Sequence, residues 1–325
     1  MATTLTLEEL NGPVEAELAE VRSATELLWR EALDLVHEPA HSHANGRGKL
    51  VRPALCLLAA GAAGGGRLDG FVRLATAIEL VHLGALIHDD VVDGSPLRRG
   101  EASLNSLWND RTAVLGGDYL VAPALAMMAE YHSCALLMDV AECMREMAAG
   151  ELADFGRGIA HRTQDDCIAL ASRKTASLFA VACSTPTRLL DGRGRGPLHR
   201  YGSRFGVAFQ LIDDVLDLCQ DERTLGKPAC SDLVEGKITL PVFFMRQAMN
   251  PDELLRLDGM KGASLSDEDR AWVGAMLSST GARARVEAVA AAYAVEARAA
   301  LGEVAPSAFR DSMAGLTDFV LIRGS

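Results

Sequence analysis

The sequence predicts an all-α protein that folds as one large helical domain over residues 1–325. Aromatic residues make up only 5% of the chain and stretches of alternating Val, Ile and Thr are scarce, which favours helices over sheets. With 49% hydrophobic residues the chain can bury a large core. Its length would also allow two domains, but no linker rich in Pro or Ser divides it, so we expect one.

Gly, Pro and Asn separate the helical stretches from one another. The first stretch, residues 7–36, carries leucines and valines near helical spacing, and a loop follows at 37–48. Pro53 opens the second helix at its first turn, as helix N-termini allow. After the first, the expected helices are 53–63, 68–93, 110–133, 134–158, 165–190, 198–220, 238–249, 251–258, 266–279, 281–303 and 306–322, with a polar loop at 221–237.

The charge and cysteine content limit the possible partners and location. A net charge of −12 without a long basic run argues against nucleic acid, although metal ions would let the protein bind an anionic substrate. Seven cysteines without a C-x-x-C pair, and the absence of a signal peptide, predict reduced thiols in a cytoplasmic protein. Gly, Arg or Asp interrupts each long apolar run short of a ~20-residue span, so we expect no transmembrane segment.

Two helices carry a narrow acidic stripe in an otherwise apolar surface. In the first, Asp89 and Asp93 are four residues apart and share a helix face with His82, while Asp90 lies alongside. The second helix contains FQLIDDVLDL, residues 209–218. Its stripe consists of Gln210, Asp213, Asp214 and Asp217, at positions i, i+3, i+4 and i+7.

A solvated outer face does not explain these stripes, because the rest of each helix is apolar and therefore buried on most sides. Carboxylates that face one another in an interior require compensating cations. Oxygen ligands without sulfur indicate a hard ion, Mg²⁺ in particular, which binds one or two carboxylates and completes its shell with water and phosphate. One D-D-x-x-D motif is modest support, and two copies in the same context are strong support.

Several basic residues stand beside Gly, Pro or Thr and together resemble contacts to a diphosphate. Each one alone is most simply a surface cation. Lys49 and Arg52, however, lie at a loop-to-helix junction, where free backbone N–H groups also favour an anion. The others are Arg98, Arg99, Lys174, Lys227 and Lys237.

The chain resembles a trans-type (E-type) polyprenyl diphosphate synthase over nearly its whole length. The segments that carry the resemblance are GKLVRP (48–53), ELVH (79–82), DDVVD (89–93), LRRG (97–100), GGD (116–118), KTASLF (174–179), FQLIDDVLD (209–217) and GKPACSDLVEGKITLP (226–241). The resemblance implies a helical bundle of the isoprenoid synthase type around a central cavity, and a homodimer. Glu101-Ala102-Ser103 and Cys230-Ser231 depart from the usual family pattern without removing a charged position.

The resemblance also implies a role for each polar residue. Two or three Mg²⁺ ions would bridge to the diphosphate of an allylic substrate, held by Asp89, Asp90, Asp93, Asp213 and Asp217, with Asp214 completing the second motif. The same diphosphate would contact Arg98, Lys174, Thr175, Gln210, Lys227 and Lys237. The diphosphate of isopentenyl diphosphate would bind Lys49, Arg52, His82 and Arg99. The residues expected to act in catalysis are Asp89, Asp90, Asp93, Arg98, Lys174, Asp213, Asp214 and Lys227.

The implied reaction is a Mg²⁺-dependent condensation of isopentenyl diphosphate with an allylic diphosphate, by ionisation, condensation and elimination. Cations stabilise the departing diphosphate, and an apolar wall protects the carbocation from water. No redox cofactor is required. We assign no protein base, because the released diphosphate is a plausible proton acceptor.

Two small residues, Gly84 and Ala85, stand one turn before Asp89, where short-chain members of the family commonly carry an aromatic residue. Close helix packing is one explanation. The other is an open cavity floor through which the growing tail passes toward Val81 and Ile78 and toward the next helix. The residues expected there are Val121, Leu125 and Met128. An open floor predicts a geranylgeranyl or longer product, with a short-chain product as the alternative.

Three other functions fit the sequence less well. A class I terpene cyclase usually carries an N/D-x-x-x-S/T-x-x-x-E second metal motif, where this chain has DDVLD. A non-catalytic partner subunit commonly lacks one aspartate motif or the arginine pair, and this chain keeps both. A helical interaction protein without activity leaves the acidic stripes unexplained.

Overall fold

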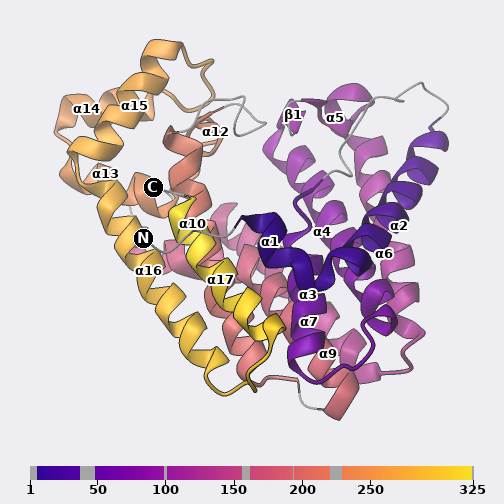
Figure 1. Cartoon of the computed structure of the whole chain (residues 1–325). Helices are drawn as coiled ribbons and strands as arrows, with labels where there is room; N and C mark the ends of the chain where they lie inside the picture. Colours follow the sequence, from indigo (N-terminus) through magenta and orange to yellow (C-terminus); the bar gives the residue numbers. More distant parts are fainter. Residues whose placement is uncertain are drawn as a thin grey trace.

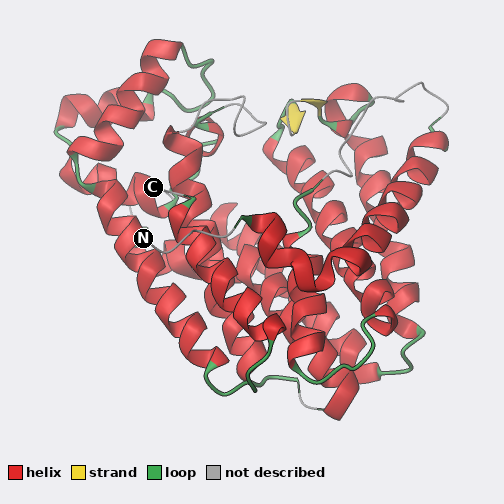
Figure 2. Ribbon diagram, viewed as in Figure 1, coloured by secondary structure: helices red, strands yellow, loops and turns green. Residues whose placement is uncertain are grey.

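The computed structural model describes residues 6–36, 48–98, 101–155, 162–192, 194–219 and 229–323. Nearly all of them form helices joined by short turns, and the only strands among them belong to one small hairpin (Figure 2). The prediction of an all-α protein is therefore confirmed.

The N-terminal segment is interrupted where the sequence analysis expected one helix. It forms α1 (Leu7–Asn11), the 3₁₀ turn η1 (Gly12–Val14) and α2 (Glu15–Asp34). Pro13 accounts for the break, because proline has no N–H to donate and its ring disfavours the helix before it. Thr6 and Glu9 form a capping box that fixes the start of α1.

Long central helices build the core and carry both aspartate motifs. They are α3 (Val51–Ala62), α4 (Asp69–Asp93), α6 (Asp110–Ala129), α7 (Cys134–Phe155), α9 (Ser177–Asp191) and α10 (Pro197–Cys219). α4 packs against α3 and α6, whereas α10 packs against α9 and α16 (Ala282–Leu301). The first motif ends α4 and the second lies near the end of α10, so each is held by a buried helix.

A π-helical turn interrupts the helix expected over 165–190. The segment forms α8 (Gln164–Ala171), the π turn η3 (Ser172–Ala176) and then α9. A π turn inserts an extra residue into the helical repeat and is frequent at functional sites. This turn contains Lys174 and Thr175, two residues that the sequence analysis assigned to substrate binding.

Short elements missed by the sequence analysis flank one end of the bundle. They are β1 (Leu97–Arg98), its antiparallel partner β2 (Glu101–Ala102), α5 (Leu104–Leu107) and α12 (Ser231–Val234). β1 and α5 lie on one side of this end and α12 on the other (Figure 1). The remaining helices follow the expected bounds within two residues: α13 (Leu240–Ala248), α14 (Pro251–Asp258), α15 (Asp267–Ser279), α16 and α17 (Ala308–Ile322).

Among the described residues, three segments are long and apolar enough to cross a membrane by length and composition, whereas the sequence analysis judged each apolar run too short. They are residues 69–93, 110–129 and 164–191. Burial inside the protein accounts for the first and third, whose apolar windows are 72% and 61% buried. The apolar stretch of α6 is only 28% buried. The large apolar side chains that this helix exposes are Val114, Leu115, Tyr119 and Leu125.

Candidate active site

A cavity of about 840 Å³ lies between the C-terminal parts of α4 and α10. Its wall also includes the start of α3, the middle of α7, the π turn, and residues 94–98, 229–237, 263–265, 270 and 323. Its lining contains six acids: Glu79, Asp89, Asp93, Asp213, Asp232 and Glu235. Members of both aspartate stripes therefore face one chamber.

Asp89 and Asp93 each lie beside a lysine from another element. The Lys174 Nζ atom is 3.4 Å from Asp89 Oδ2 and donates to Glu151 Oε2 at 2.5 Å. The Lys237 Nζ atom donates to Asp93 Oδ2 at 2.6 Å across the cavity. Burial raises the pKa of Asp89, and the charge of Lys174 opposes this shift.

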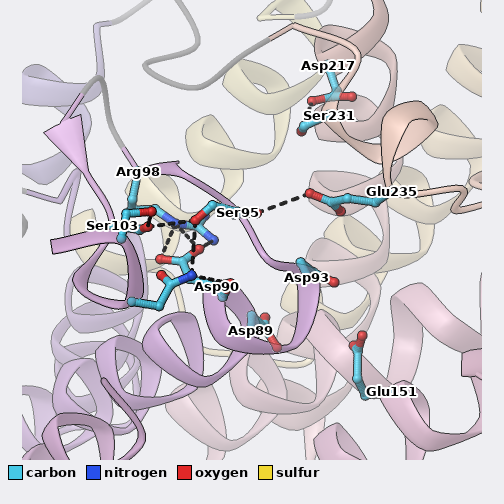
Figure 3. Close-up of polar contacts among 12 residues, drawn as sticks. Asp89, Asp90, Asp93, Ser95, Arg98, Ser103, Glu151, Asp217, Ser231 and Glu235 are labelled. Atoms are coloured by element: carbon cyan, nitrogen blue, oxygen red, sulfur yellow. Dashed lines mark hydrogen bonds and ion pairs between the residues drawn. The ribbon is translucent and has the colours of Figure 1, made fainter. Parts of the chain in front are cut away.

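Asp90, between these two acids, has a different environment. It is buried and accepts a hydrogen bond from Arg98 Nε at 2.8 Å. Figure 3 shows it on the side of α4 that faces Arg98 of β1, whereas Asp93 lies on the side of Glu235. Burial raises the pKa of Asp90, against the effect of Arg98. Asp90 lies outside the cavity lining and holds Arg98 at the cavity edge, and its expected role as a metal ligand stays a prediction.

The first two acids of the second motif also differ. Asp213 lines the cavity, and its Oδ1 atom accepts a hydrogen bond from Arg323 at 3.0 Å. Asp214 is buried and accepts a hydrogen bond from Gln210 Nε2 at 2.7 Å, while Gln210 Oε1 accepts one from Thr175 at 2.6 Å. Burial raises the pKa of Asp214 well above its usual range. Only Asp213 presents its carboxylate to the main cavity.

Asp217, the third acid of the second motif, caps a helix. Its Oδ1 atom accepts a hydrogen bond from Ser231 Oγ at 2.9 Å and its Oδ2 atom one from the Asp232 backbone N–H at 3.3 Å. The side chain is buried and does not line the cavity. In this arrangement Asp217 holds the start of α12 against the end of α10, and its expected role as a metal ligand stays a prediction.

The two lysines stay protonated at neutral pH despite their partial burial. Burial lowers the pKa of Lys174, but Asp89 and Glu151 more than offset it and the pKa is raised. The pKa of Lys237 is likewise raised, because Glu235 and neighbouring aspartates outweigh the effect of burial. Both side chains thus supply permanent positive charge to the cavity.

A second group of predicted residues lies where the start of α3 meets α4. Lys49, Arg52 and His82 all line the cavity. The Arg52 Nη1 atom is 3.0 Å from His82 Nε2, and the Arg52 guanidinium lies 4.3 Å from the centroid of the Phe179 ring. These two contacts position the guanidinium at the cavity wall, between His82 and the Phe179 ring.

The carboxylates that face the cavity fit a hard divalent cation that enters with a phosphate. Asp89, Asp93 and Asp213 offer oxygen donors only. Across the described ranges, no three His, Cys, Asp or Glu side chains form a group that could hold an ion alone. Mg²⁺ usually binds one or two carboxylates and takes the remaining ligands from water and substrate phosphates, so this donor set suits it.

The family model named polyprenyl synthetase matches residues 33–272, well over half of the chain. The chain belongs to this family. A relative from Rhodobacter capsulatus, an all-trans-nonaprenyl-diphosphate synthase (geranyl-diphosphate specific), is 37% identical over 85% of each chain. A short chain isoprenyl diphosphate synthase from Methanothermobacter thermautotrophicus is 34% identical over 85% of this chain and 86% of its own.

A solved structure supports the same assignment for this polyprenyl synthetase family member. The polyprenyl synthase from Caulobacter crescentus CB15, complexed with calcium and isoprenyl diphosphate, has a TM-score of 0.87. It is 33% identical and covers 99% of each chain. Because the named relatives make products of different lengths, the comparisons leave the product length open.

The structure explains Gly84 by close helix packing. A Cβ atom at Gly84 would lie 2.6 Å from Val121 and 3.0 Å from the Gly117 carbonyl oxygen, so the residue faces α6 and not the cavity. The prediction that Gly84 opens the cavity floor is therefore wrong, whereas Ala85 does line the cavity. Val81 is buried outside the lining.

Packing between α4 and α6 also explains a glycine of the GGD segment, residues 116–118. The His88 ring lies against Gly117, where a Cβ atom would be 2.3 Å from Nε2, and it is 3.6 Å from Asp118. Leu125, expected as a wall for the tail, is 38% exposed on α6. The other residues expected to line a deeper path, Ile78, Val121 and Met128, also lie outside the cavity lining.

Several residues in or beside the cavity were not predicted from the sequence. Glu151 binds Lys174, Glu235 lies 2.7 Å from Lys237 and accepts a hydrogen bond from Ser95, and Arg323 binds Asp213. Of these three residues, only Glu235 could have been predicted as a site residue from the local sequence, because it stands two residues before Lys237, a predicted diphosphate contact. Arg99 and Lys227, both predicted to bind diphosphate, lie outside the described residues.

Proposed function

We propose that the protein condenses isopentenyl diphosphate with an allylic diphosphate and releases diphosphate and a proton. The observation that carries this proposal is the cavity itself, where Asp89, Asp93 and Asp213 face a chamber that also contains Lys174 and Lys237. A diphosphate in this chamber would meet positive side chains from the π turn and from the segment after α12. Mg²⁺ bound with it would supply Lewis-acid stabilisation of the leaving group.

The side chains divide the work between two diphosphates. Lys174 and Lys237 are placed to neutralise the allylic diphosphate as its C–O bond breaks, because both are charged and point into the chamber near the acids. Lys49, Arg52 and His82 form the separate basic group that would hold isopentenyl diphosphate. Two anions held this way bring the double bond of one substrate toward the allylic carbon of the other.

The apolar part of the wall suits a carbocation. Ala85, Leu86, Met147 and Phe209 line the cavity beside the charged groups. They exclude water that would otherwise trap the cation as an alcohol. The proton lost after condensation goes to the departing diphosphate in this proposal, and we assign no protein base.

We also propose a geranylgeranyl or longer product. Ala85 lines the cavity one turn before Asp89 and presents only a methyl group there. Val81 and Ile78 lie beneath it and are buried, so a long tail requires their side chains to repack. A short-chain product remains the alternative.

The deciding experiment gives the purified protein Mg²⁺, labelled isopentenyl diphosphate and, in turn, dimethylallyl, geranyl, farnesyl and geranylgeranyl diphosphate. We expect consumption of isopentenyl diphosphate and products of increasing length. The Asp213→Ala variant should lose this activity, whereas Asp267→Ala, at an exposed acid of α15, should keep it. A protein that releases diphosphate from an allylic substrate without consuming isopentenyl diphosphate would be a cyclase and would contradict the proposal.

We propose in addition a cytoplasmic homodimer that pairs through α6. Leu115 is 67% exposed there and Met138 of the neighbouring α7 is 71% exposed. The seven free thiols support a reducing compartment. Light scattering should give twice the monomer mass for the wild type and the monomer mass for Leu115→Glu. Leu255→Glu, on the 75% exposed leucine of α14, should leave the dimer intact. A monomeric wild type would refute the pairing.

A further inference from the structure

Each acid of the two motifs that faces the cavity is already paired with a cation of the chain. Asp89 lies beside Lys174 and Asp93 beside Lys237, and the sequence analysis had assigned both lysines to the site. The third pair is different. Asp213 is bound by Arg323, which follows the last helix and lies 110 positions further along the chain.

The geometry holds Arg323 at Asp213 by two contacts. One guanidinium nitrogen, Nη2, is 3.0 Å from Asp213 Oδ1, and the guanidinium carbon lies 4.5 Å from the centroid of the Phe209 ring. The Arg323 side chain is 16% exposed, so the ring and the cavity wall cover most of it. This arginine is built into the chamber and is not a surface cation that reaches the acid by chance.

Two features make the pairing exchangeable. The Asp213 side chain is 47% exposed, and ion pairs of such acids are weak because water screens them. The Arg323 Nε atom is buried without a hydrogen-bond partner in the described protein, so this pose leaves one donor unsatisfied. An anion arriving in the chamber could satisfy it.

We propose that Arg323 is the resident counter-cation of Asp213 and must give up this carboxylate when a divalent ion binds there. The inference rests on the metal role proposed above for Asp213. A guanidinium and a divalent ion repel each other and compete for the same oxygen atoms, so the arginine weakens binding of the ion alone. Arg323 weakens metal binding less when the metal enters with a diphosphate, because the displaced guanidinium can then pair with the negative charge of the diphosphate. The end of α17 is thereby coupled to occupancy of the second aspartate motif.

The test measures binding of Mn²⁺ alone to the metal-stripped, full-length protein by calorimetry, without substrate. Arg323→Gln should bind Mn²⁺ roughly two- to fivefold more tightly than the wild type, the range expected for loss of a partly exposed competing ion pair. The control is Arg310→Gln, which removes the same charge near the start of α17, where Arg310 pairs with Asp311. This control should bind Mn²⁺ as the wild type does.

A double-mutant cycle separates competition at Asp213 from a general change in charge. In an Asp213→Asn background, Arg323→Gln should no longer alter Mn²⁺ affinity, because the contested carboxylate is gone. Arg323→Lys, which keeps the charge, should fall between wild type and Arg323→Gln, and it serves as the test variant if the glutamine variant does not fold. Affinity no tighter in the arginine variants than in Arg310→Gln would overturn the proposal. Because the readout is metal binding, it is independent of whether the protein forms prenyl products.

Discussion

Asp213 and Asp217 belong to one sequence motif, yet the structure predicts that their loss has different consequences. Asp217 is 1% exposed and accepts hydrogen bonds from Ser231 and from the Asp232 backbone. Hydrogen bonds to a charged group contribute about 1.5–3 kcal/mol each. With part of this offset by relief of the buried charge, Asp217→Ala should lower the free energy of unfolding by about 2–4 kcal/mol.

This cost translates into a measurable shift in melting temperature. Unfolding entropy is about 2.1 cal/mol/K per residue, so the 325-residue chain has about 0.7 kcal/mol/K in total. Asp217→Ala should therefore lower Tm by roughly 3–6 °C in a thermal unfolding experiment without metal. Prenyl transfer should fall as well, because the segment that carries Lys237 loses its anchor, while the affinity for Mn²⁺ should stay near that of the wild type.

Asp213→Ala is the matched comparison. Its side chain is about half exposed and, within the described part of the chain, its ion pair is with Arg323, so Tm should change by no more than about 1 °C. Affinity for Mn²⁺ and prenyl transfer should both be lost. If Asp217→Ala keeps its Tm and loses Mn²⁺ affinity as Asp213→Ala does, Asp217 is a metal ligand and the capping role is wrong.

Three further substitutions test other parts of the site. Gly84→Ala should cost about 1–3 kcal/mol, because its methyl group would meet Val121, and should leave the product lengths unchanged; thermal unfolding and thin-layer chromatography check the two outcomes. Ala85→Phe should shorten the products by filling the cavity one turn before the first motif. An unchanged distribution of product lengths would show that Ala85 does not form the cavity floor. Asp214→Asn should keep the hydrogen bond from Gln210 and gain stability over the wild type as pH rises. Burial raises the pKa of Asp214 above its unfolded value, so the wild type loses stability from this group as pH increases through that interval. Melting curves from about pH 4 to 7 should show that the difference in Tm between Asp214→Asn and the wild type increases with pH. A difference that stays constant would contradict a raised pKa of Asp214 in the folded protein.

Local patterns in the sequence predicted the features that depend on local periodicity. The i, i+4 spacing placed Asp89 and Asp93 on one face of α4, and both line the cavity. The same rule failed for Asp217, because its face of α10 meets α12, an element of four residues in a segment expected to be a loop. Periodicity shows that residues share a face but not what packs against it.

Contacts between distant segments could not be predicted. Arg323 reaches Asp213 only because α17 ends at the mouth of the cavity, and no spacing in the sequence connects the two. For Gly84 the sequence showed that a small residue stands at this position but not why. The reason is the close approach of Gly117 on α6, which leaves no room for a larger side chain. The π turn at 172–176 has no simple sequence signature, since its composition is that of an ordinary helix.

The two halves of the chamber are far apart along the chain, and this has a consequence for biosynthesis. Asp93 and its partner Lys237 are 144 positions apart. At translation rates of about 5–20 residues per second, the ribosome needs roughly 7–29 s to add the second half after the first has appeared. Lys174 appears within that interval, but Asp213 is added only late in it and Lys237 only at its end, so until then the nascent chain lacks the full set of groups that would ionise an allylic diphosphate. A truncated polypeptide is thus prevented by its topology from generating a reactive carbocation that it could not contain.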